Sequence, residues 1–118
     1  MEKDCLLVIT LFGAGDKRLC GPAMVKASSK HTVGRVIACF AGWAGVKAGA
    51  VQFHDMAGNA VSADVTVAAA GFPPGRAVVN AMLAPGASGP SAEATLAPFS
   101  MLDVTDSELA ALAGGLMQ

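Results

Sequence analysis

Tyrosine is missing from this chain of 118 residues, tryptophan occurs once, and charged residues make up only 14% of the sequence. The formal net charge is −1, so the chain has no excess of lysine and arginine for binding nucleic acid or an anionic membrane surface. No apolar run approaches the roughly 20 residues that a membrane-spanning helix needs. The N-terminus also lacks the basic start and the small-residue cleavage site of a secretory signal. We therefore expect a cytoplasmic protein whose partners include neither nucleic acid nor membrane.

Cysteine is also scarce, and its spacing argues against several kinds of metal centre. Cys5, Cys20 and Cys39 are far apart in the sequence and form no Cys-x-x-Cys pair, which argues against a closed metal site. An iron–sulfur cluster of the plant-ferredoxin type needs a much tighter group of cysteines. We expect reduced, mostly buried thiols without an intramolecular disulfide, and we expect no metal and no cofactor.

The sequence offers little evidence of a catalytic site. The two histidines, His31 and His54, have no serine, cysteine or acidic residue nearby in a recognisable triad pattern. The segment from Gly13 to Gly15 resembles the start of a dinucleotide-binding fingerprint, but no third glycine and no helix follow at the required spacing. We interpret this segment as a turn between two strands, and we expect that the protein is not an enzyme.

The clearest positive feature is a short amphipathic helix over 32–44. Thr32 can cap its start through the side-chain hydroxyl, and Gly45 can adopt the left-handed conformation that ends a helix. Apolar residues recur at helical spacing and gather on one face of this helix. These residues are Val33, Val36, Ile37, Phe40 and Ala44. We expect the helix to pack across a sheet with Phe40 at the centre of the core.

Strand-like segments lie on both sides of the predicted helix. Residues 5–12 and 20–27 predict two strands that are joined by a turn at 13–16. Three segments after the helix have the alternation or the composition of strands. These segments are 50–55, 60–61 and 76–83. The sequence therefore predicts one α+β domain in which a helix separates an early pair of strands from three later ones.

The helix and a second segment resemble the ubiquitin-like family. The run Thr-Val-x-x-Val-x-x-x-Phe-x-x-x-x-Gly-Val at 32–46 is similar, without a gap, to Thr-Ile-x-x-Val-x-x-x-Ile-x-x-x-x-Gly-Ile in the helix of ubiquitin. Residues 63–72 resemble a later ubiquitin segment, with Thr66, Val67 and Phe72 at matching offsets. The resemblance implies a ubiquitin-like β-grasp fold, in which a mixed sheet of four to five strands packs against one helix. We place this domain at 1–84.

The composition changes after the predicted domain. Residues 85–98 are rich in proline, glycine and serine, which predicts a flexible linker. Residues 99–118 are expected to form a tail with a short helix over 103–113. Its narrow apolar stripe consists of Leu109, Leu112 and Leu116. Because so short a helix is marginal alone, it either docks on the domain or binds a partner. The chain is equally consistent with being the amino-terminal part of a longer protein.

One face of the predicted sheet is left open to solvent. Successive strand residues point to opposite faces, so each strand divides into a core-facing set and an outward set. The core-facing set is Leu7, Ile9, Leu11, Val25, Phe53, Val79, Ala81 and Leu83. The outward set is Leu6, Val8, Thr10, Met24, Lys26, Gln52, His54, Val78, Asn80 and Met82. The outward set mixes apolar and polar side chains, which suits a moderate protein–protein interface.

We therefore expect a non-enzymatic adaptor or assembly domain that binds another protein through its open sheet face. In ubiquitin this face carries an isoleucine-centred patch on which its binding proteins dock. The resemblance places His54 where ubiquitin has that isoleucine. We therefore do not expect ubiquitin-binding proteins to recognise this chain well.

Two alternatives remain open at this point. The first is a protein modifier of the ubiquitin class that is processed after Gly115. Such modifiers expose a Gly-Gly pair just beyond the last strand, where this chain instead has the segment 84–88 without that pair. The second alternative is a small carrier protein or enzyme built on the same fold.

Overall fold

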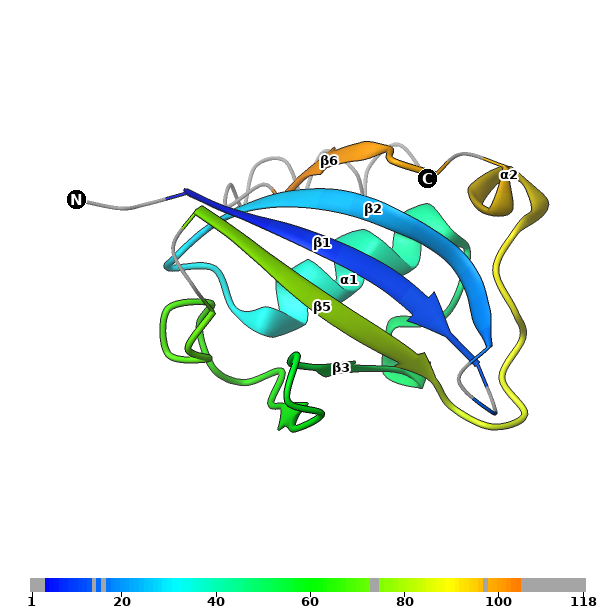
Figure 1. Ribbon diagram of the computed structural model, residues 1–118, viewed down its shortest axis with the longest axis horizontal. Helices are drawn as coiled ribbons and strands as arrows, with labels where there is room; N and C mark the ends of the chain where they lie inside the picture. Colours follow the sequence, from blue (N-terminus) through cyan, green and yellow to red (C-terminus); the bar gives the residue numbers. More distant parts are fainter. Residues whose placement is uncertain (1–3, 14, 16, 73–74, 97, 105–118) are drawn as a thin grey trace, which may run out of the picture.

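Six strands form one mixed sheet in a computed structural model that describes residues 4–13, 15, 17–72, 75–96 and 98–104. The order of strands across the sheet is β4-β3-β5-β1-β2-β6, and the long helix α1 covers one face of it (Figure 1). The elements in chain order are β1 (Asp4–Phe12), β2 (Arg18–Ser28), α1 (Val33–Ala44), η2 (Ala48–Ala50), β3 (Val51–His54), β4 (Ala60–Val61), β5 (Gly75–Leu83), α2 (Ala92–Thr95) and β6 (Met101–Asp103). The protein is thus an α+β domain whose arrangement is compatible with a β-grasp.

The two longest pairings lie at the centre of the sheet. β1 pairs antiparallel with β2 and parallel with β5, so that Leu7 lies between Val25 on one side and Ala77 on the other. β3 pairs antiparallel with the other edge of β5, and β4 adds a two-residue edge strand. The predicted order of two strands, a helix, a strand, a short strand and a last strand is confirmed for this part of the chain.

The boundaries of α1 follow from the two residues predicted to set them. The Thr32 hydroxyl oxygen accepts a hydrogen bond from the backbone N–H of Arg35 at 3.2 Å, which satisfies one of the free amides at the start of the helix. Gly45 has a φ of 78°, and its N–H donates to the carbonyl oxygen of Ala41. This left-handed conformation cannot continue a right-handed helix, so the helix ends there. Glycine is suited to the position because it has no Cβ atom to oppose a positive φ.

The apolar face of α1 and the inner face of the sheet enclose the core. Phe40 and Phe53 are fully buried, as are seven of the eight residues that the strand alternation assigned to the core-facing set. The eighth, Leu83, is partly buried against the same cluster. Val67 and Phe72, which carry part of the family resemblance, also pack against this core. The predicted direction of the side chains on β1, β2, β3 and β5 is therefore confirmed.

A bulge in β2 bends the hairpin that β2 forms with β1. Ile9 pairs with Ala23 and Leu11 pairs with Cys20, so two residues of β2, Gly21 and Pro22, lie opposite a single residue of β1. Gly21 has a φ of 96°, and a Cβ atom placed on it would come within 2.9 Å of the carbonyl oxygen of Ile9. This position therefore requires glycine both for its backbone conformation and for the close approach of β1.

The segment after β5 differs from the linker and helical tail expected there. The prediction of four to five strands is wrong, because 101–103 form a sixth strand that pairs in parallel with β2. The backbone of this segment bonds along β2: Phe99 N–H donates to Pro22 O at 2.6 Å, and Met24 N–H donates to Ser100 O at 2.8 Å. Residues 92–95 form one helical turn. The sequence did not indicate β6, because its three residues carry no local strand signal and form a strand only by pairing with β2.

Another part of the predicted tail lies outside the described residues. That part is 105–118, which includes most of the predicted helix at 103–113, the stripe of Leu109, Leu112 and Leu116, and the pair Gly114 and Gly115.

Candidate functional site

The outer face of the sheet is the face that α1 does not cover (Figure 1). It carries all ten residues predicted to point outward. None of the ten is buried, whereas their neighbours along the same strands line the core. Register between the strands arranges these side chains in rows that cross the sheet. We refer to this surface as the outer face and describe its rows in turn.

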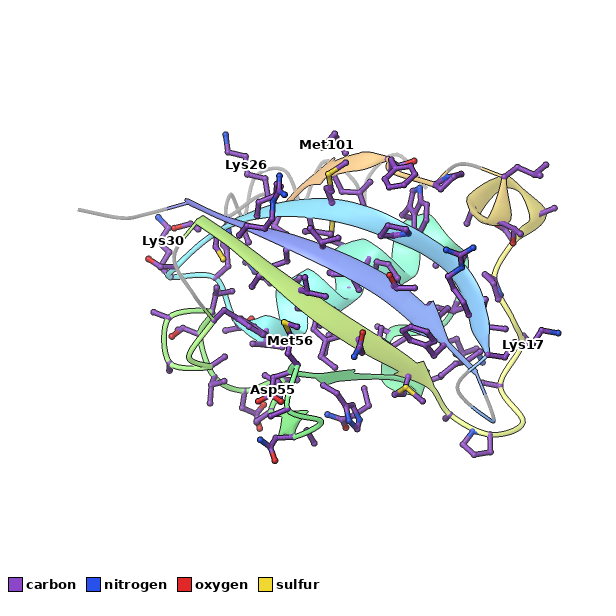
Figure 2. The ribbon with its side chains drawn as sticks, viewed as in Figure 1. Lys17, Lys26, Lys30, Asp55, Met56 and Met101 are labelled. Atoms are coloured by element: carbon purple, nitrogen blue, oxygen red, sulfur yellow. The ribbon has the colours of Figure 1, made fainter. Side chains whose placement is uncertain are left out.

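One row is apolar across four strands. Val78 of β5 pairs with Val8 of β1, Val8 pairs with Met24 of β2, and Met24 pairs with Met101 of β6. Val78 and Met101, at the two ends, are 42% and 62% exposed. Met101 lies at the edge of the sheet near Lys26 in Figure 2. We call these four residues the Val8 row, and they form the apolar centre of the outer face.

The rows on either side of the Val8 row are more polar. On one side, Arg76 pairs with Leu6, Leu6 pairs with Lys26, and Lys26 pairs with Asp103 of β6, so that row holds two cations and ends at an aspartate. On the other side lie Thr10, Asn80 and His54, paired across β1, β5 and β3. An apolar centre between polar margins is the usual anatomy of a protein–protein interface.

A fourth row lies at the end of the sheet where β5 stops. Gln52 pairs with Met82, Met82 pairs with Phe12, and Phe12 pairs with Arg18. Phe12 was missing from the predicted set, although the alternation of its own strand after Leu6, Val8 and Thr10 would have found it. Met101 was also missing, because the segment that carries it was expected to be part of a tail.

The outer face is too wide for its ten predicted residues to form one cluster. Lys26 lies on β2 and His54 lies on β3, with β1 and β5 between them. The structure brings Val8, Met24 and Val78 together in neighbouring strands. The other predicted residues of β3 and β5, namely Gln52, His54, Asn80 and Met82, instead lie together at the other end of the face.

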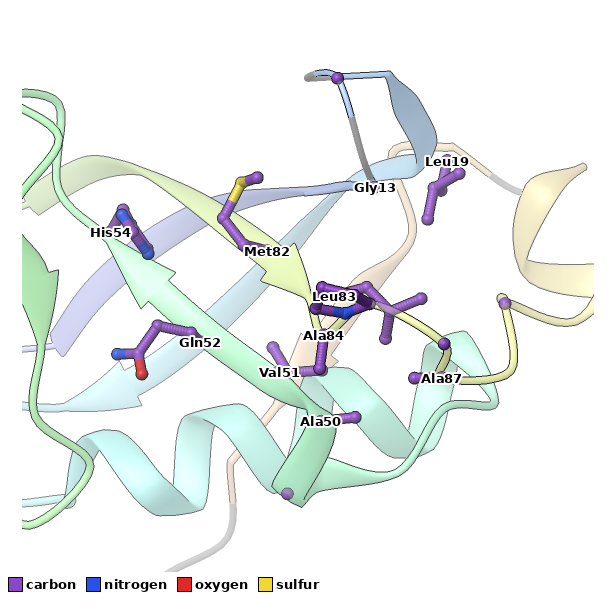
Figure 3. A pocket seen from close by; sticks show the side chains of 15 residues that line it. Gly13, Leu19, Ala50, Val51, Gln52, His54, Met82, Leu83, Ala84 and Ala87 are labelled. Carbon is purple, nitrogen blue, oxygen red and sulfur yellow. The ribbon is translucent and has the colours of Figure 1, made fainter.

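A shallow cleft of about 750 Å³ begins at this end of the face (Figure 3). Its walls come from the β1–β2 turn, the start of β3 and the segment that follows β5. Small side chains predominate beside a few larger apolar ones, and two residues supply polar groups at one side. The lining residues are Gly13, Gly15, Leu19, Gly49, Ala50, Val51, Gln52, His54, Met82, Leu83, Ala84, Pro85, Gly86, Ala87 and Gly89.

The polar groups beside the cleft make local hydrogen bonds. The Gln52 side-chain amide donates to the carbonyl oxygen of Val61 at 3.1 Å, which draws this side chain toward β4. The His54 Nδ1 lies 3.4 Å from the carbonyl oxygen of Gly58. These contacts tie the two side chains to the β3–β4 edge. Of the three outward-set residues that line the cleft, Met82 is the apolar one.

The cysteines lie away from the outer face. Cys5, Cys20 and Cys39, which all belong to the described residues, form no disulfide. Cys5 and Cys20 are buried on the core side, and burial raises the pKa of both thiols because it disfavours the charged thiolate. Among residues 4–13, 15, 17–72, 75–96 and 98–104, no three histidine, cysteine or acidic side chains gather as a metal site requires.

No helix in the part of the chain that the structure describes is both long and apolar enough to cross a membrane. Comparison with known proteins adds no family: no protein-family model matches this chain, and the search of the curated proteins finds no match.

Proposed function

We propose that this protein is a non-enzymatic, ubiquitin-like interaction domain of the β-grasp class that binds another protein through its outer face. The single observation that carries the proposal is the Val8 row, which is continuous across four strands and exposed at both ends. One exposed apolar side chain is ordinary on a protein surface, but a contiguous apolar row is typical of a surface that binds.

The composition of the outer face supports the same function. Two of the four residues in the Val8 row are methionines, and Met82 is a third methionine on this face. Methionine is enriched at protein interfaces because its unbranched side chain adapts to different partner shapes. Polar groups such as Thr10 and Asn80 beside the row can add hydrogen bonds that orient the partner.

The β-grasp part of the proposal has its support in the fold. α1 follows the first two strands and packs on the sheet, and β1 pairs in parallel with β5, the last strand of the predicted domain. The segment 63–72 lies against the start of α1, where Val33 N–H donates to Val65 O and Val67 N–H donates to His31 O. Both segments that resemble ubiquitin therefore contact one another.

The experiment compares two exposed methionines that differ only in position. Met101→Glu places a charge at the end of the Val8 row, whereas Met56→Glu places the same charge in the β3–β4 turn (Figure 2). The tagged full-length chain and both variants are used to capture partners from cells of the source organism, and the captured proteins are quantified by mass spectrometry. Losing about 2 kcal/mol of binding energy would lower the affinity about thirtyfold.

We expect Met101→Glu to lose the partner and Met56→Glu to keep it. Val78→Glu, at the opposite end of the row, is expected to behave like Met101→Glu. All three variants should retain the thermal melt of the parent chain, because exposed substitutions usually change stability by less than about 0.5 kcal/mol. Retention of the partner by both Val8-row variants would contradict the proposal, as would equal loss by Met56→Glu.

A further inference from the structure

Four methionines lie in the part of the chain that the structure describes, and two of them are largely exposed. Met56 is 77% exposed and Met101 is 62% exposed, whereas Met24 and Met82 are partly buried. Met101 lies on β6 at the edge of the sheet, and Met56 lies in the turn between β3 and β4 (Figure 2). Solvent therefore reaches one methionine within the outer face and one outside it.

The thioether sulfur of an exposed methionine reacts with peroxides. The sulfur donates an electron pair to one oxygen of hydrogen peroxide, and the O–O bond breaks. The second oxygen leaves as hydroxide and takes the proton of the transferred OH group to become water. The sulfur loses two electrons and the peroxide gains two. The product, methionine sulfoxide, is polar, and methionine sulfoxide reductases convert it back to methionine.

Met101 occupies a position where such a change matters for binding. β6 is the last strand of the described sheet, so Met101 has a paired residue, Met24, on one side only. The other side chains of the Val8 row are apolar and have no hydrogen-bond donor for a sulfoxide oxygen. In the free protein this oxygen would be hydrated, because Met101 is exposed.

The fold does not depend on these methionines. The core that the described residues form contains no methionine, either among its fully buried side chains or among those that pack against it. Oxidation of Met56 and Met101 therefore leaves the packing between α1 and the sheet unchanged. A loss of binding after oxidation can thus be separated from unfolding.

We propose that Met101 is an oxidation site, and that its conversion to the sulfoxide by a peroxide prevents the outer face from binding its partner. The effect on binding rests on the proposed function, whereas the order in which the methionines are oxidised does not. A partner seated on the Val8 row would cover the sulfoxide oxygen without giving it a donor, which opposes binding. Because the reaction is reversible by reductases, the same residue can restore the surface.

The first test measures where the chain is oxidised. The full-length protein is treated with dilute hydrogen peroxide, sampled over time and analysed by peptide mass spectrometry. We expect Met56 and Met101 to gain an oxygen well before Met24 and Met82, with an unchanged thermal melt while only the exposed pair is oxidised. Equal rates at all four methionines, or a lower melting temperature at that stage, would overturn the proposal.

The second test measures binding, with the protein that the parent chain captures as the probe. We expect peroxide treatment to weaken its binding about tenfold, as one covered polar group without a hydrogen bond would. Treatment with methionine sulfoxide reductases should restore it. Met101→Leu, which is apolar and resists oxidation, should bind before and after peroxide. Met56→Leu is the matched control and should lose binding on oxidation as the parent chain does.

The outcomes separate this proposal from the proposed function. Undiminished binding by the oxidised parent chain, or equal loss by oxidised Met101→Leu, would overturn the role of Met101 oxidation. If Met101→Glu still loses the partner in that case, the outer face remains the binding surface and only the oxidation proposal fails. If Met101→Glu and Val78→Glu both keep the partner, both proposals fail.

Discussion

Phe40 of α1 meets Phe53 of β3 edge to face, with 6.3 Å between the ring centroids and 72° between the ring planes. Both rings are fully buried, and Trp43 lies 5.7 Å from Phe40 on the next turn of the helix. Because β3 also pairs with β5, this contact connects the helix with the side of the sheet where the cleft begins.

Phe40→Ala is expected to destabilise the protein by about 3–5 kcal/mol, because it removes a buried ring and leaves a cavity. Such a loss is a large share of the roughly 5–15 kcal/mol that holds a typical domain folded. Urea denaturation of the parent chain and the variant measures it. Phe53→Ala and the double variant complete a cycle, in which the edge-to-face pair should show a coupling of about 0.5–1.5 kcal/mol. An unchanged midpoint for Phe40→Ala would contradict the described packing.

Gly21→Ala is expected to destabilise the protein by at least about 1–2 kcal/mol, because the new Cβ atom meets the carbonyl oxygen of Ile9 and the backbone has a positive φ. The matched control is Gly42→Ala on the exposed side of α1, where a Cβ atom meets nothing within 4 Å. Alanine favours a helix over glycine, so this control should gain about 0.5–1 kcal/mol. Thermal melts of the two variants should therefore move in opposite directions, and a shift in the same direction would refute the assignment of the bulge.

The sequence predicted those elements that have a local signal of their own. α1 could be placed to within a residue, because Thr32 and Gly45 mark its ends and five apolar residues mark one face. The core-facing residues of the long strands followed from alternation, since one buried face fixes the direction of every second side chain. β6 could not be predicted, because its three residues form a strand only through bonds with β2, far away in the sequence. For the same reason, Met101 was not included in the predicted outer face.

The burial of His31 was missed for a different reason. His31 was noted as one of two histidines, but a sequence does not show that its ring is buried or that Nδ1 is occupied by Ser28 N–H.

The reactivity of the three cysteine thiols tests how deeply each one is buried. The raised pKa of the Cys5 and Cys20 thiols, caused by burial, keeps them protonated and slow to react at neutral pH. Cys39 on α1 is only partly buried. We expect iodoacetamide to label Cys39 first in the native chain and to label the other two only after unfolding, as mass spectrometry would show. Rapid labelling of all three thiols would contradict this order.

His54→Glu and Met82→Glu test how far the proposed binding surface extends. Both residues lie outward on the neighbouring strands β3 and β5, at the end of the outer face beside the cleft. If the partner covers this end as well as the Val8 row, both variants should keep a native melt and lose the partner. If both variants bind normally, the interface is confined to the side of β1, β2 and β6. Unfolding of either variant would show that its side chain faces the core.

The β3–β4 turn should depend on pH through Asp55. Hydrogen bonds from the backbone N–H groups of Asn59 and Ala57, each 2.9 Å from Oδ1, hold the pKa of Asp55 below its ordinary value of 3.8. A carboxylate whose pKa is lowered on folding stabilises the folded state at pH values above its ordinary pKa. This contribution disappears as the pH falls through the lowered pKa.

Asp55→Ala should therefore be less stable than the parent chain at neutral pH, and the difference should shrink as the pH falls below about 4. Denaturation at a series of pH values measures this difference. Asp64→Ala, a change at another exposed aspartate, serves as the matched control. A difference between Asp55→Ala and the parent chain that stays constant down to acid pH would contradict the role of this carboxylate.

The pairing of β6 with β2 determines where this chain can be truncated without exposing an edge of the sheet. A protein shortened to end at residue 84 keeps β1 to β5 and loses the segment whose Phe99 N–H and Ser100 O bond to Pro22 and Met24. It would then present the backbone of β2 as an unpaired edge beside the exposed side chains of the outer face, and such edges recruit other strands. The shortened protein should therefore form oligomers as its concentration rises. β6 thus protects the sheet against self-association. Any partner that displaced β6 would have to cover the edge of β2 in its place.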